Sequence, residues 1–371
     1  MASTTRSQPA GPARRARLRR SDCSGPGLHR LRRGRGFSYV DEDGRPVGDA
    51  EVVERIRGLA IPPAWKDVWI CADPLGHLQA TGIDDAGRKQ YLYHPRWRER
   101  RDREKFRRME RFAQLLPRLR RQIKTDIGAD AELASHEVPS RTAVLAVAVR
   151  LLDVGLFRIG SEQYADEDHG VGLATVRREH VAVRGDEEIE FDYPAKGGVR
   201  RVQVIKDPVC GELVRTLRRR RAGPSELLAY RQSRRWMPLR SSEINDYLKH
   251  HLGDEFSAKD FRTWNATVLA SVSLAFEGGV GASKAARKRA MDRAVAGVAE
   301  LLGNTRAVAR RAYIDPRVFD RYLSGWTIAG GLKRLGDLHP GDDRGRARLE
   351  AAVLDLLEEE TDSTSLSRVA A

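Results

Sequence analysis

Apolar residues fill one stretch of the chain almost continuously, between residues 140 and 154, where the sequence reads SRTAVLAVAVRLLDV. Pro139 and Ser140 are typical of a helix start and Gly155 of a helix end, so this stretch predicts a buried helix. A second helix is predicted over residues 97–124, because apolar positions recur there at helical spacing within a highly charged segment. These positions are Phe106, Met109, Phe112, Leu115, Leu116 and Leu119.

Alternating apolar positions and turn residues predict strands on either side of these helices. Residues 28–95 contain short strand patterns, together with a short amphipathic helix in DAEVVERIRGLAI. Farther along, Ile189, Phe191 and Tyr193 alternate with acidic residues in a half-buried strand. The turn PAKGG and the return strand VRRVQVI follow, so a hairpin is expected.

Helical patterns dominate the remainder of the chain. They are predicted over residues 223–239, 241–253, 256–276, 282–303, 304–315, 315–325 and 349–360. Asn304 is interpreted as the N-cap of its helix. The pattern predicts an α+β fold, with a small N-terminal, mostly antiparallel β domain and a larger, mainly α-helical domain that contains a small β-hairpin or sheet. The expected parts are a basic mobile arm (1–22), an N-terminal α+β domain (23–96), the larger domain (97–345) and an acidic C-terminal helix with its tail (346–371).

The charge of the chain indicates which classes of partner it can bind. It has 371 residues, of which 40% are hydrophobic and 32% charged, with a formal net charge of +15. Such an excess of positive charge favours a polyanion or an anionic membrane surface as partner. No apolar run reaches the ~18 residues of a membrane-spanning helix, and the N-terminus has no apolar signal region. Cys23, Cys71 and Cys210 are scattered, which is typical of a reducing cytoplasm.

Common local signatures of catalysis are missing from the sequence. It has no GxxxxGK[ST] loop for ATP, no HExxH and no paired Cys/His spacing for zinc. Several carboxylates gather in GSEQYADEDHG, namely Glu162, Asp166, Glu167 and Asp168. They are interpreted as a solvated acidic turn, because no second cluster supports a metal site.

A set of basic residues and one tyrosine remain as candidate catalytic residues. Arg158 follows the apolar helix as either a capping cation or a phosphate clamp. Lys196 lies at the hairpin tip, where a lysine is either solvated or functional. Phosphoryl transfer requires a nucleophile, charge stabilisation and a proton for the leaving oxygen. Arg158, Arg262, Lys196 and Tyr313 are of the residue types that supply these functions.

Four motifs together carry a resemblance to a known family. FRIGSEQYADEDHGVGLATVRREHV resembles the first-arginine motif of the poxvirus-type bacterial type IB DNA topoisomerases, within the tyrosine recombinase/topoisomerase IB superfamily. AKGG resembles that family's general-acid lysine turn, SAKDFRTWNAT its second-arginine segment, and LLGNTRAVARRAYIDP its nucleophile helix. IPPAW and GRKQYLYHPRW resemble its small N-terminal domain, so the similarity runs from about residue 28 to 325.

The resemblance implies an isomerase that cleaves one DNA strand through a 3′-phosphotyrosyl intermediate at Tyr313. Arg158 and Arg262 would bind the scissile phosphate, Lys196 would protonate the leaving 5′ oxygen, and Lys259 would assist. Asn304 stands where many members carry His; it can donate a hydrogen bond but transfers no proton. The resemblance also implies relaxation of supercoils by strand rotation, no ATP and no metal. It further implies no other cofactor and a monomeric clamp on double-stranded DNA in the bacterial cytoplasm, at the nucleoid and away from membranes.

The N-terminal domain carries its own DNA-binding candidates, Arg88, Gln90, Tyr91 and Tyr93, on one strand. Aromatic residues interleaved with cations suit a surface against a nucleic-acid groove, although a strand with buried tyrosines would have the same pattern. A tyrosine recombinase is the main alternative for the whole chain. It would show H-x-x-R before the second arginine, where this chain has Lys259 and Arg262. A non-catalytic basic DNA-binding protein would explain the charge alone.

Overall fold

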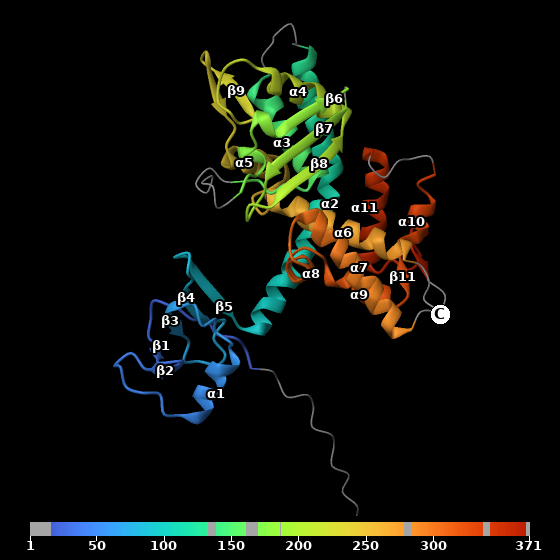
Figure 1. Ribbon diagram of the computed structural model, residues 1–371. Helices are drawn as coiled ribbons and strands as arrows, with labels where there is room; N and C mark the ends of the chain where they lie inside the picture. The colour runs from blue at the N-terminus through green and yellow to red at the C-terminus, as the bar shows by residue number, and fades with distance from the viewer. Residues whose placement is uncertain are drawn as a thin grey trace, which may run out of the picture. The chain divides into compact units, whose positions relative to one another are not determined.

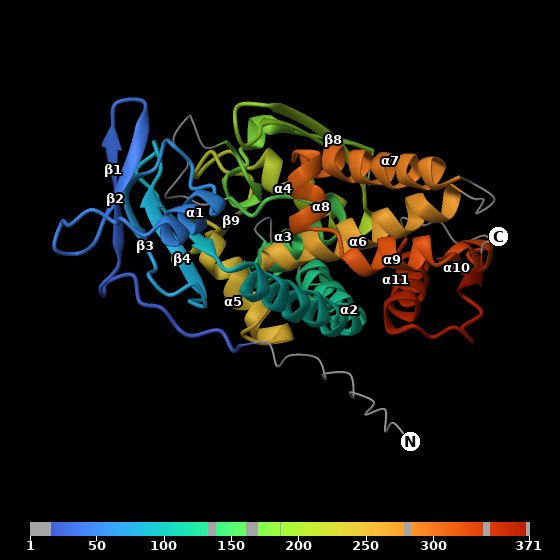
Figure 2. The same ribbon diagram turned by 90° about the horizontal axis from the view of Figure 1, so that it is seen from below.

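The computed structural model describes residues 16–132, 139–160, 170–185, 187–277, 283–336 and 342–368. The chain divides into two compact units, residues 1–105 and 106–371. Figure 1 shows the elements coloured along the chain, and Figure 2 shows them from below. The arm expected at residues 1–22 lies largely outside the described residues, as does the acidic turn at residues 161–169.

The first unit is built on a five-stranded antiparallel sheet in the order β2-β1-β3-β4-β5. Its elements are β1 (Leu28–Arg33), β2 (Gly36–Val40), α1 (Ala50–Gly58), β3 (Lys66–Ile70), β4 (Leu78–Ile83) and β5 (Lys89–Tyr93). Asp49 caps α1 by accepting from the backbone N–H groups of Glu51 and Val52. The helix packs on the sheet through Ile56, which is buried together with apolar residues of β3 and β4. A small apolar core therefore forms between one helix and one sheet.

The second unit is mainly helical. Its helices are the continuation of α2 (Pro95–Glu132), which begins in the first unit, α3 (Arg141–Gly155), α4 (Pro208–Arg219), α5 (Ser241–Leu252), α6 (Ala258–Phe276), α7 (Lys284–Leu302), α8 (Arg306–Ala312), α9 (Pro316–Leu323), α10 (Ala329–Lys333) and α11 (Asp343–Glu358), with short 3-10 turns at Leu173–Thr175 and Arg178–His180. Its strands are β6 (Val181–Arg184), β7 (Glu188–Pro194), β8 (Arg200–Lys206), β9 (Ala229–Gln232), β10 (Arg235–Pro238), β11 (Trp326–Thr327) and β12 (Ser367–Arg368). The α+β prediction is therefore confirmed.

Helix α3 is the centre of this unit's core, as its continuous apolar sequence predicts. Ser140 caps it by accepting from the backbone N–H of Ala143, and almost every side chain along it is buried. The antiparallel sheet β6-β7-β8 supplies Ile189, Phe191 and Tyr193 to the same core. Figure 2 shows α6 and α7 side by side, with α8 next to them. This packing fixes the ends of α3, α6 and α7, from which the candidate site is built.

The helix predicted over residues 223–239 is wrong, because this segment contains the hairpin of β9 and β10. Gln232 pairs with Arg235 across a two-residue turn, and Ser233 and Arg234 both have positive φ, at 47° and 71°. Such turns usually carry Asn or Gly at those positions. Neither residue is present at these two positions, so no turn could be predicted between the strands. Helix α4 was not predicted either, although Asp207 caps it and Pro208 opens it.

Candidate active site

The backbone around Arg158 is held by a second segment of the chain. Helix α3 ends at Gly155, and the next residue, Leu156, adopts a left-handed conformation with φ 55°. The backbone N–H of Leu173 then donates to the carbonyl of Arg158 at 2.9 Å, and that of Ala174 donates to Ile159 at 2.7 Å. Gly160 has φ 79°, and a Cβ there would lie 2.9 Å from the Cα of Gly172. The two glycines therefore permit the close approach that fixes Arg158.

Lys196 lies exposed at the tip of the hairpin that joins β7 to β8, as predicted. The tip is closed by hydrogen bonds between Ala195 and Val199 and between Gly198 and Ala195. Gly197 and Gly198 have φ values of 81° and 71°, which side chains rarely adopt. The glycine pair thus presents Lys196 at a tight turn beside the segment that holds Arg158.

Arg262 is positioned in the first turns of α6. Ser257 and Asp260 form the capping box at the helix start. Arg262 is 3% exposed and donates to the carbonyl of Leu302 at 2.8 Å and to that of Leu156. Burial lowers the pKa of its guanidinium to about 10, because desolvation outweighs the attraction of Tyr313. The side chain is a buried, positively charged donor that joins the ends of α3 and α7.

Tyr313 follows α8 directly and is 8% exposed. The hydroxyl of Thr267 in α6 contacts the carbonyl of Tyr313 at 3.4 Å and accepts from the backbone N–H of Asp315 at 3.1 Å. The guanidinium carbon of Arg262 lies 5.3 Å from the centre of the tyrosine ring, and the Nζ of Lys259 lies 6.0 Å from it. Tyr313 is therefore held between α6 and α8, beside two cations.

These cations change the acidity of Tyr313. Burial by itself would raise the pKa of the phenol. The charge of Arg262 and its hydrogen bond, followed by the charges of Lys259 and Arg158, more than offset burial and lower this pKa below its ordinary value. A lower pKa gives a larger fraction of phenolate at a given pH, which favours a nucleophilic role.

Asn304 contacts Arg158 directly. Its Oδ1 accepts from the Nη2 of Arg158, which also donates to the carbonyl of Gly303 at 3.0 Å. The Nδ2 of Asn304 is buried without a hydrogen-bond partner among the described residues. The prediction that Asn304 caps α8 is wrong, because Thr305 is the N-cap and its hydroxyl accepts from the N–H of Val308. Thr305 is also a favoured capping residue, so the helix begins one position later.

A cavity of about 710 Å³ brings four of the candidate residues together. Arg158, Lys196, Arg262 and Asn304 line it, whereas Tyr313 and Lys259 do not. Tyr313 is nevertheless close, through its contact with Arg262. The positive charge of the lining suits an anion with several oxygen atoms, such as a phosphodiester.

Arg201 and Gln203 also line this cavity and were missed by sequence reasoning. Arg201 donates to the carbonyl of Leu301 at 2.7 Å and to the Oε1 of Gln203 at 2.9 Å. In the strand register Arg201 is opposite Tyr193, and Gln203 is opposite Phe191. Both residues therefore occupy positions that alternate with the exposed valines of β8. Because side chains of a strand alternate between its two faces, Arg201 and Gln203 are on the same face, opposite the exposed valines. Two polar residues on that face could have indicated from the sequence that they line a site.

The DNA-binding candidates lie together in the first unit. Tyr91 and Tyr93 are 47% and 37% exposed, and their rings stack with centres 6.2 Å apart. The reading in which these tyrosines are buried is therefore wrong. Arg88 and Gln90 both donate to the carboxylate of Asp84, at 3.0 and 2.8 Å. An aromatic pair thus lies exposed on β5, next to a fixed polar group.

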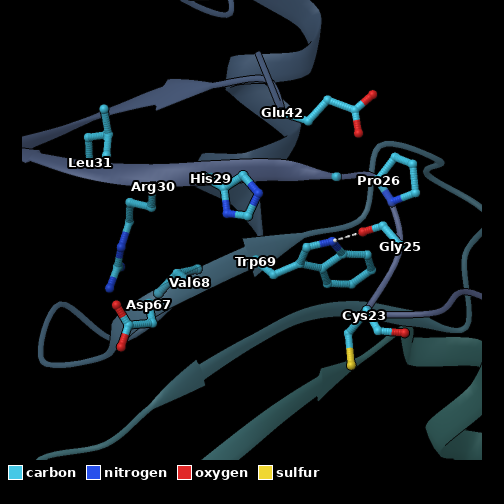
Figure 3. Close-up of a pocket in the computed structure, with 12 residues that line it drawn as sticks. Cys23, Gly25, Pro26, His29, Arg30, Leu31, Glu42, Asp67, Val68 and Trp69 are labelled. Atoms are coloured by element: carbon cyan, nitrogen blue, oxygen red, sulfur yellow. Dashed lines mark hydrogen bonds between the residues drawn. The ribbon is translucent and has the colours of Figure 1, made fainter. Parts of the chain in front are cut away.

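A second feature of the first unit is a cavity of about 750 Å³ beside β1 and β3 (Figure 3). The indole of Trp69 donates to the carbonyl of Gly25 at 3.1 Å, and a Cβ on Gly27 would collide with the same ring. Glycine is therefore required where the N-terminal segment crosses the indole. Among the described residues, no group of three or more His, Cys, Asp or Glu side chains could hold a metal ion.

Two family models match this chain. Residues 94–323 match the catalytic core of eukaryotic DNA topoisomerase I, and residues 36–84 match the N-terminal domain of bacterial DNA topoisomerase IB. The two matched segments define the class of the protein as a DNA topoisomerase. The chain belongs to the DNA topoisomerase I family of type IB, so the resemblance found in its motifs is confirmed.

Similarity to individual proteins agrees with this family. The chain is 26% identical over 303 residues to DNA topoisomerase 1B of Acanthamoeba polyphaga mimivirus, covering 80% of this chain and 87% of that protein. It is 30% identical over 128 residues to DNA topoisomerase 1 of Schizosaccharomyces pombe, covering 34% of this chain and 15% of that protein. For DNA topoisomerase 1 of Candidozyma auris the identity is 28% over 155 residues, with 41% and 20% covered. Each fungal match thus covers a small part of a longer protein.

No helix among the described residues has both the length and the apolar character needed to cross a bilayer.

Proposed function

We propose that this type IB topoisomerase relaxes supercoiled DNA by reversible cleavage of one strand, with Tyr313 as the nucleophile. The phenolate oxygen of Tyr313 attacks the phosphorus atom, the bond to the 5′ oxygen breaks, and a 3′-phosphotyrosyl bond forms. Lys196 gives a proton to the leaving 5′ oxygen. The free strand rotates, and the 5′ hydroxyl then returns its proton to Lys196 and attacks the phosphotyrosine, which restores the DNA and the phenolate of Tyr313.

The observation that carries this proposal is the position of the Tyr313 ring beside Arg262 and Lys259, where positive charge lowers the pKa of the phenol. Arg262 is buried and fixed by two backbone carbonyls, so it is preorganised before DNA binds. Preorganised donors at a developing charge are commonly the largest single contribution to catalysis. Arg158 and Arg262 would stabilise the nonbridging oxygens of the scissile phosphate.

The same chemistry accounts for the proposed independence from ATP and metals. The phosphotyrosyl bond conserves the energy of the broken phosphodiester, so religation needs no second energy source. Arginine and lysine side chains supply the positive charge that other phosphoryl-transfer enzymes obtain from metal ions. Strand rotation is driven by the torsional energy already stored in the supercoiled DNA.

The partner proposed here is double-stranded DNA, bound by a monomer at the nucleoid in the bacterial cytoplasm. The match of residues 36–84 to a bacterial N-terminal domain supports the bacterial assignment, and the net charge of +15 supports a polyanionic partner. Tyr91 and Tyr93 would lie against the duplex, and Arg88 and Gln90 would contact it beside them. The exposure of Tyr91 and Tyr93 on β5 supports this role.

Supercoiled plasmid incubated with the protein and EDTA, without ATP, tests this function. We expect a ladder of relaxed topoisomers, and a denaturing gel should show DNA attached covalently to wild-type protein but not to Tyr313→Phe. Relaxation by Tyr313→Phe at the wild-type rate would exclude this tyrosine as the nucleophile. Strand exchange between paired sites would instead indicate a recombinase.

A further inference from the structure

A cavity of about 720 Å³ in the first unit is lined by a concentration of arginines. They are Arg17, Arg19, Arg20, Arg96, Arg100 and Arg103. One carboxylate, that of Glu99, also lines the cavity. Arginines placed so close together repel one another, and the free energy of that repulsion is recovered when a polyanion binds.

The N-terminal side of this cavity is fixed by backbone pairing. The N–H of Arg19 donates to the carbonyl of Leu75 at 2.9 Å, and the N–H of His77 donates to the carbonyl of Arg19 at 2.8 Å. The hydroxyl of Ser21 donates to the carbonyl of Leu78 at 3.0 Å. The arginines at positions 17, 19 and 20 are therefore carried by a docked segment. This segment precedes residue 36, where the match to the bacterial N-terminal domain begins.

The other side of the cavity is formed by the first turns of α2. Arg96 donates to the carbonyl of Ala16 at 2.7 Å, which ties the two sides together. Arg100 is paired with Glu104, and Arg19 with Asp73. Arg17, Arg20 and Arg103 are exposed and have no carboxylate partner among the described residues. These three guanidinium groups are therefore available to an external anion.

A chain of aromatic rings connects the cavity with the exposed tyrosines of β5. Tyr91 stacks on Tyr93, whose ring centre lies 6.3 Å from that of His77. The ring of His77 in turn contacts Trp97 edge-on, with centres 4.8 Å apart, and both His77 and Trp97 line the cavity. The arginines therefore lie next to the surface on which the DNA duplex is proposed to rest.

We propose that this arginine cavity binds backbone phosphates of the same DNA duplex that contacts β5, and so extends the DNA-binding surface of the first unit. The ligand chemistry is a row of phosphate groups, which a free polyphosphate would share. The continuity with Tyr91 and Tyr93 favours DNA as the source. The proposal rests on the proposed function only in taking duplex DNA as the partner.

The salt dependence of DNA binding tests this assignment with the full chain in its Tyr313→Phe form, which separates binding from cleavage. The affinity for a labelled duplex of several helical turns is measured over a range of salt concentrations for a triple variant with R17A, R20A and R103A. Each lost phosphate contact lowers the slope of log affinity against log salt by about 1, so the triple variant should lose about 3.

Matched variants show whether the site or the total charge is responsible. R17K, R20K and R103K together keep the charge and should keep most of the slope. R35A, R45A and R57A together remove the same charge from exposed positions of the first unit that do not line the cavity, and should change the slope by less than 1. Thermal unfolding of each variant checks that the first unit remains folded.

An unchanged slope in the R17A, R20A and R103A variant would overturn the proposal, as would an equal loss in the control triple. Binding of inorganic tripolyphosphate to the same variants is measured as a second experiment. If it binds at the cavity while the DNA slope is unchanged, the site takes a free polyphosphate and the DNA assignment is wrong. Failure of the proposed relaxation activity would be seen separately, in the plasmid assay with Tyr313 intact.

Discussion

The Nη2 of Arg158 donates to the Oδ1 of Asn304, while the Nδ2 of the same amide is buried and has no hydrogen-bond partner among the described residues. A buried donor without a partner costs about 1–3 kcal/mol. A phosphate oxygen in the adjoining cavity would satisfy it. Asn304 would thus orient Arg158 with one end of its amide and contact the scissile phosphate with the other.

Replacement of Asn304 by alanine should therefore slow cleavage. A hydrogen bond to a charged group contributes about 1.5–3 kcal/mol, which corresponds to a roughly 10- to 100-fold loss in rate. Single-turnover cleavage of a duplex whose cut fragment dissociates measures this rate without religation. Asn304→Asp should lose more, because it removes the donor and adds a negative charge beside the phosphate. Equal rates for Asn304→Ala and the wild type would show that the amide has no role in cleavage.

Asn304→His provides the complementary variant. Histidine keeps a hydrogen-bond donor and can carry positive charge near neutral pH. We expect this variant to cleave at least as fast as the wild type, and to gain most at low pH, where the imidazole is protonated. If Asn304→His cleaved as slowly as Asn304→Ala, a hydrogen-bond donor at this position would not be sufficient, and the shape of the amide would be required.

The pH dependence of cleavage should report the interaction between Arg262 and Tyr313. If the phenolate of Tyr313 is the nucleophile, the cleavage rate should rise with pH toward the pKa of Tyr313, as the ascending limb of a bell-shaped acid–base profile. Because the charge of Arg262 lowers this pKa, the midpoint should lie below the ordinary tyrosine value of about 10. Arg262→Gln removes that charge, so its midpoint should move to higher pH.

The maximum rate of this profile tests a second role of Arg262, which is stabilisation of the charge that develops on the phosphate oxygens. Loss of a preorganised donor at the developing charge should lower the maximum rate by about 10²–10³. Rates measured from neutral to alkaline pH give both quantities. An unchanged midpoint in Arg262→Gln would mean that Arg262 does not control the acidity of Tyr313.

The local signals around the site were readable from the sequence because each is built from neighbouring residues. Ser140 caps α3, and the box of Ser257 and Asp260 caps α6, as their sequences predict. The glycine pair at residues 197 and 198 likewise forms the expected hairpin tip beneath Lys196. In each case the interactions that fix the backbone lie within a few residues of one another.

Features that depend on distant segments could not be predicted in this way. The carbonyls that hold Arg262 belong to Leu156 and Leu302, which are distant in sequence from it and from each other. Arg201 reaches the site only because the register of β8 places it opposite Tyr193. The β9–β10 hairpin could not be predicted because Ser233 and Arg234 both have positive φ, which their residue types rarely adopt.

A buried ionic network should make the second unit sensitive to changes at Asp153. This carboxylate is 1% exposed and accepts hydrogen bonds from Arg120 at 2.9 Å and from Arg346 at 2.8 Å, with Arg150 at 3.5 Å. Asp153→Asn leaves these arginines without their shared counter-charge. Breaking a buried pair costs about 3–5 kcal/mol, which urea unfolding can measure. Asp246→Asn, at an exposed position on α5, should cost under about 0.5 kcal/mol.

The same network predicts an acid dependence of stability. Burial would raise the pKa of Asp153, but its arginine neighbours lower it well below the ordinary value. A depressed folded-state pKa adds stability above the unfolded-state pKa of about 3.9, and this stability is lost as the pH falls toward the folded-state value. Asp153→Asn should therefore lose less stability than the wild type when the pH falls below about 4. Parallel acid dependences would exclude this contribution.

Lys196 offers a test that separates proton transfer from binding. If its ammonium group protonates the leaving 5′ oxygen, Lys196→Ala should cleave ordinary DNA about 10²–10⁴-fold more slowly, in the range of general acids. A 5′-bridging sulfur is a better leaving group and needs little protonation, so this variant should recover most of its rate on the phosphorothioate substrate. Arg158→Ala should recover much less, because its expected role is at the nonbridging oxygens.

A lysine that only contributes surface charge would behave differently. Lys196→Ala would then show the same fractional loss on both substrates, and higher salt would reproduce its effect on the wild type. Lys259 is the natural comparison, because its Nζ lies 6.0 Å from the centre of the Tyr313 ring, although it does not line the cavity. If recovery on the sulfur substrate followed Lys259→Ala instead of Lys196→Ala, the general acid would be the lysine beside the nucleophile. Recovery by Lys196→Ala alone would assign that role to the hairpin tip, whose glycine turn holds the ammonium group at the edge of the cavity.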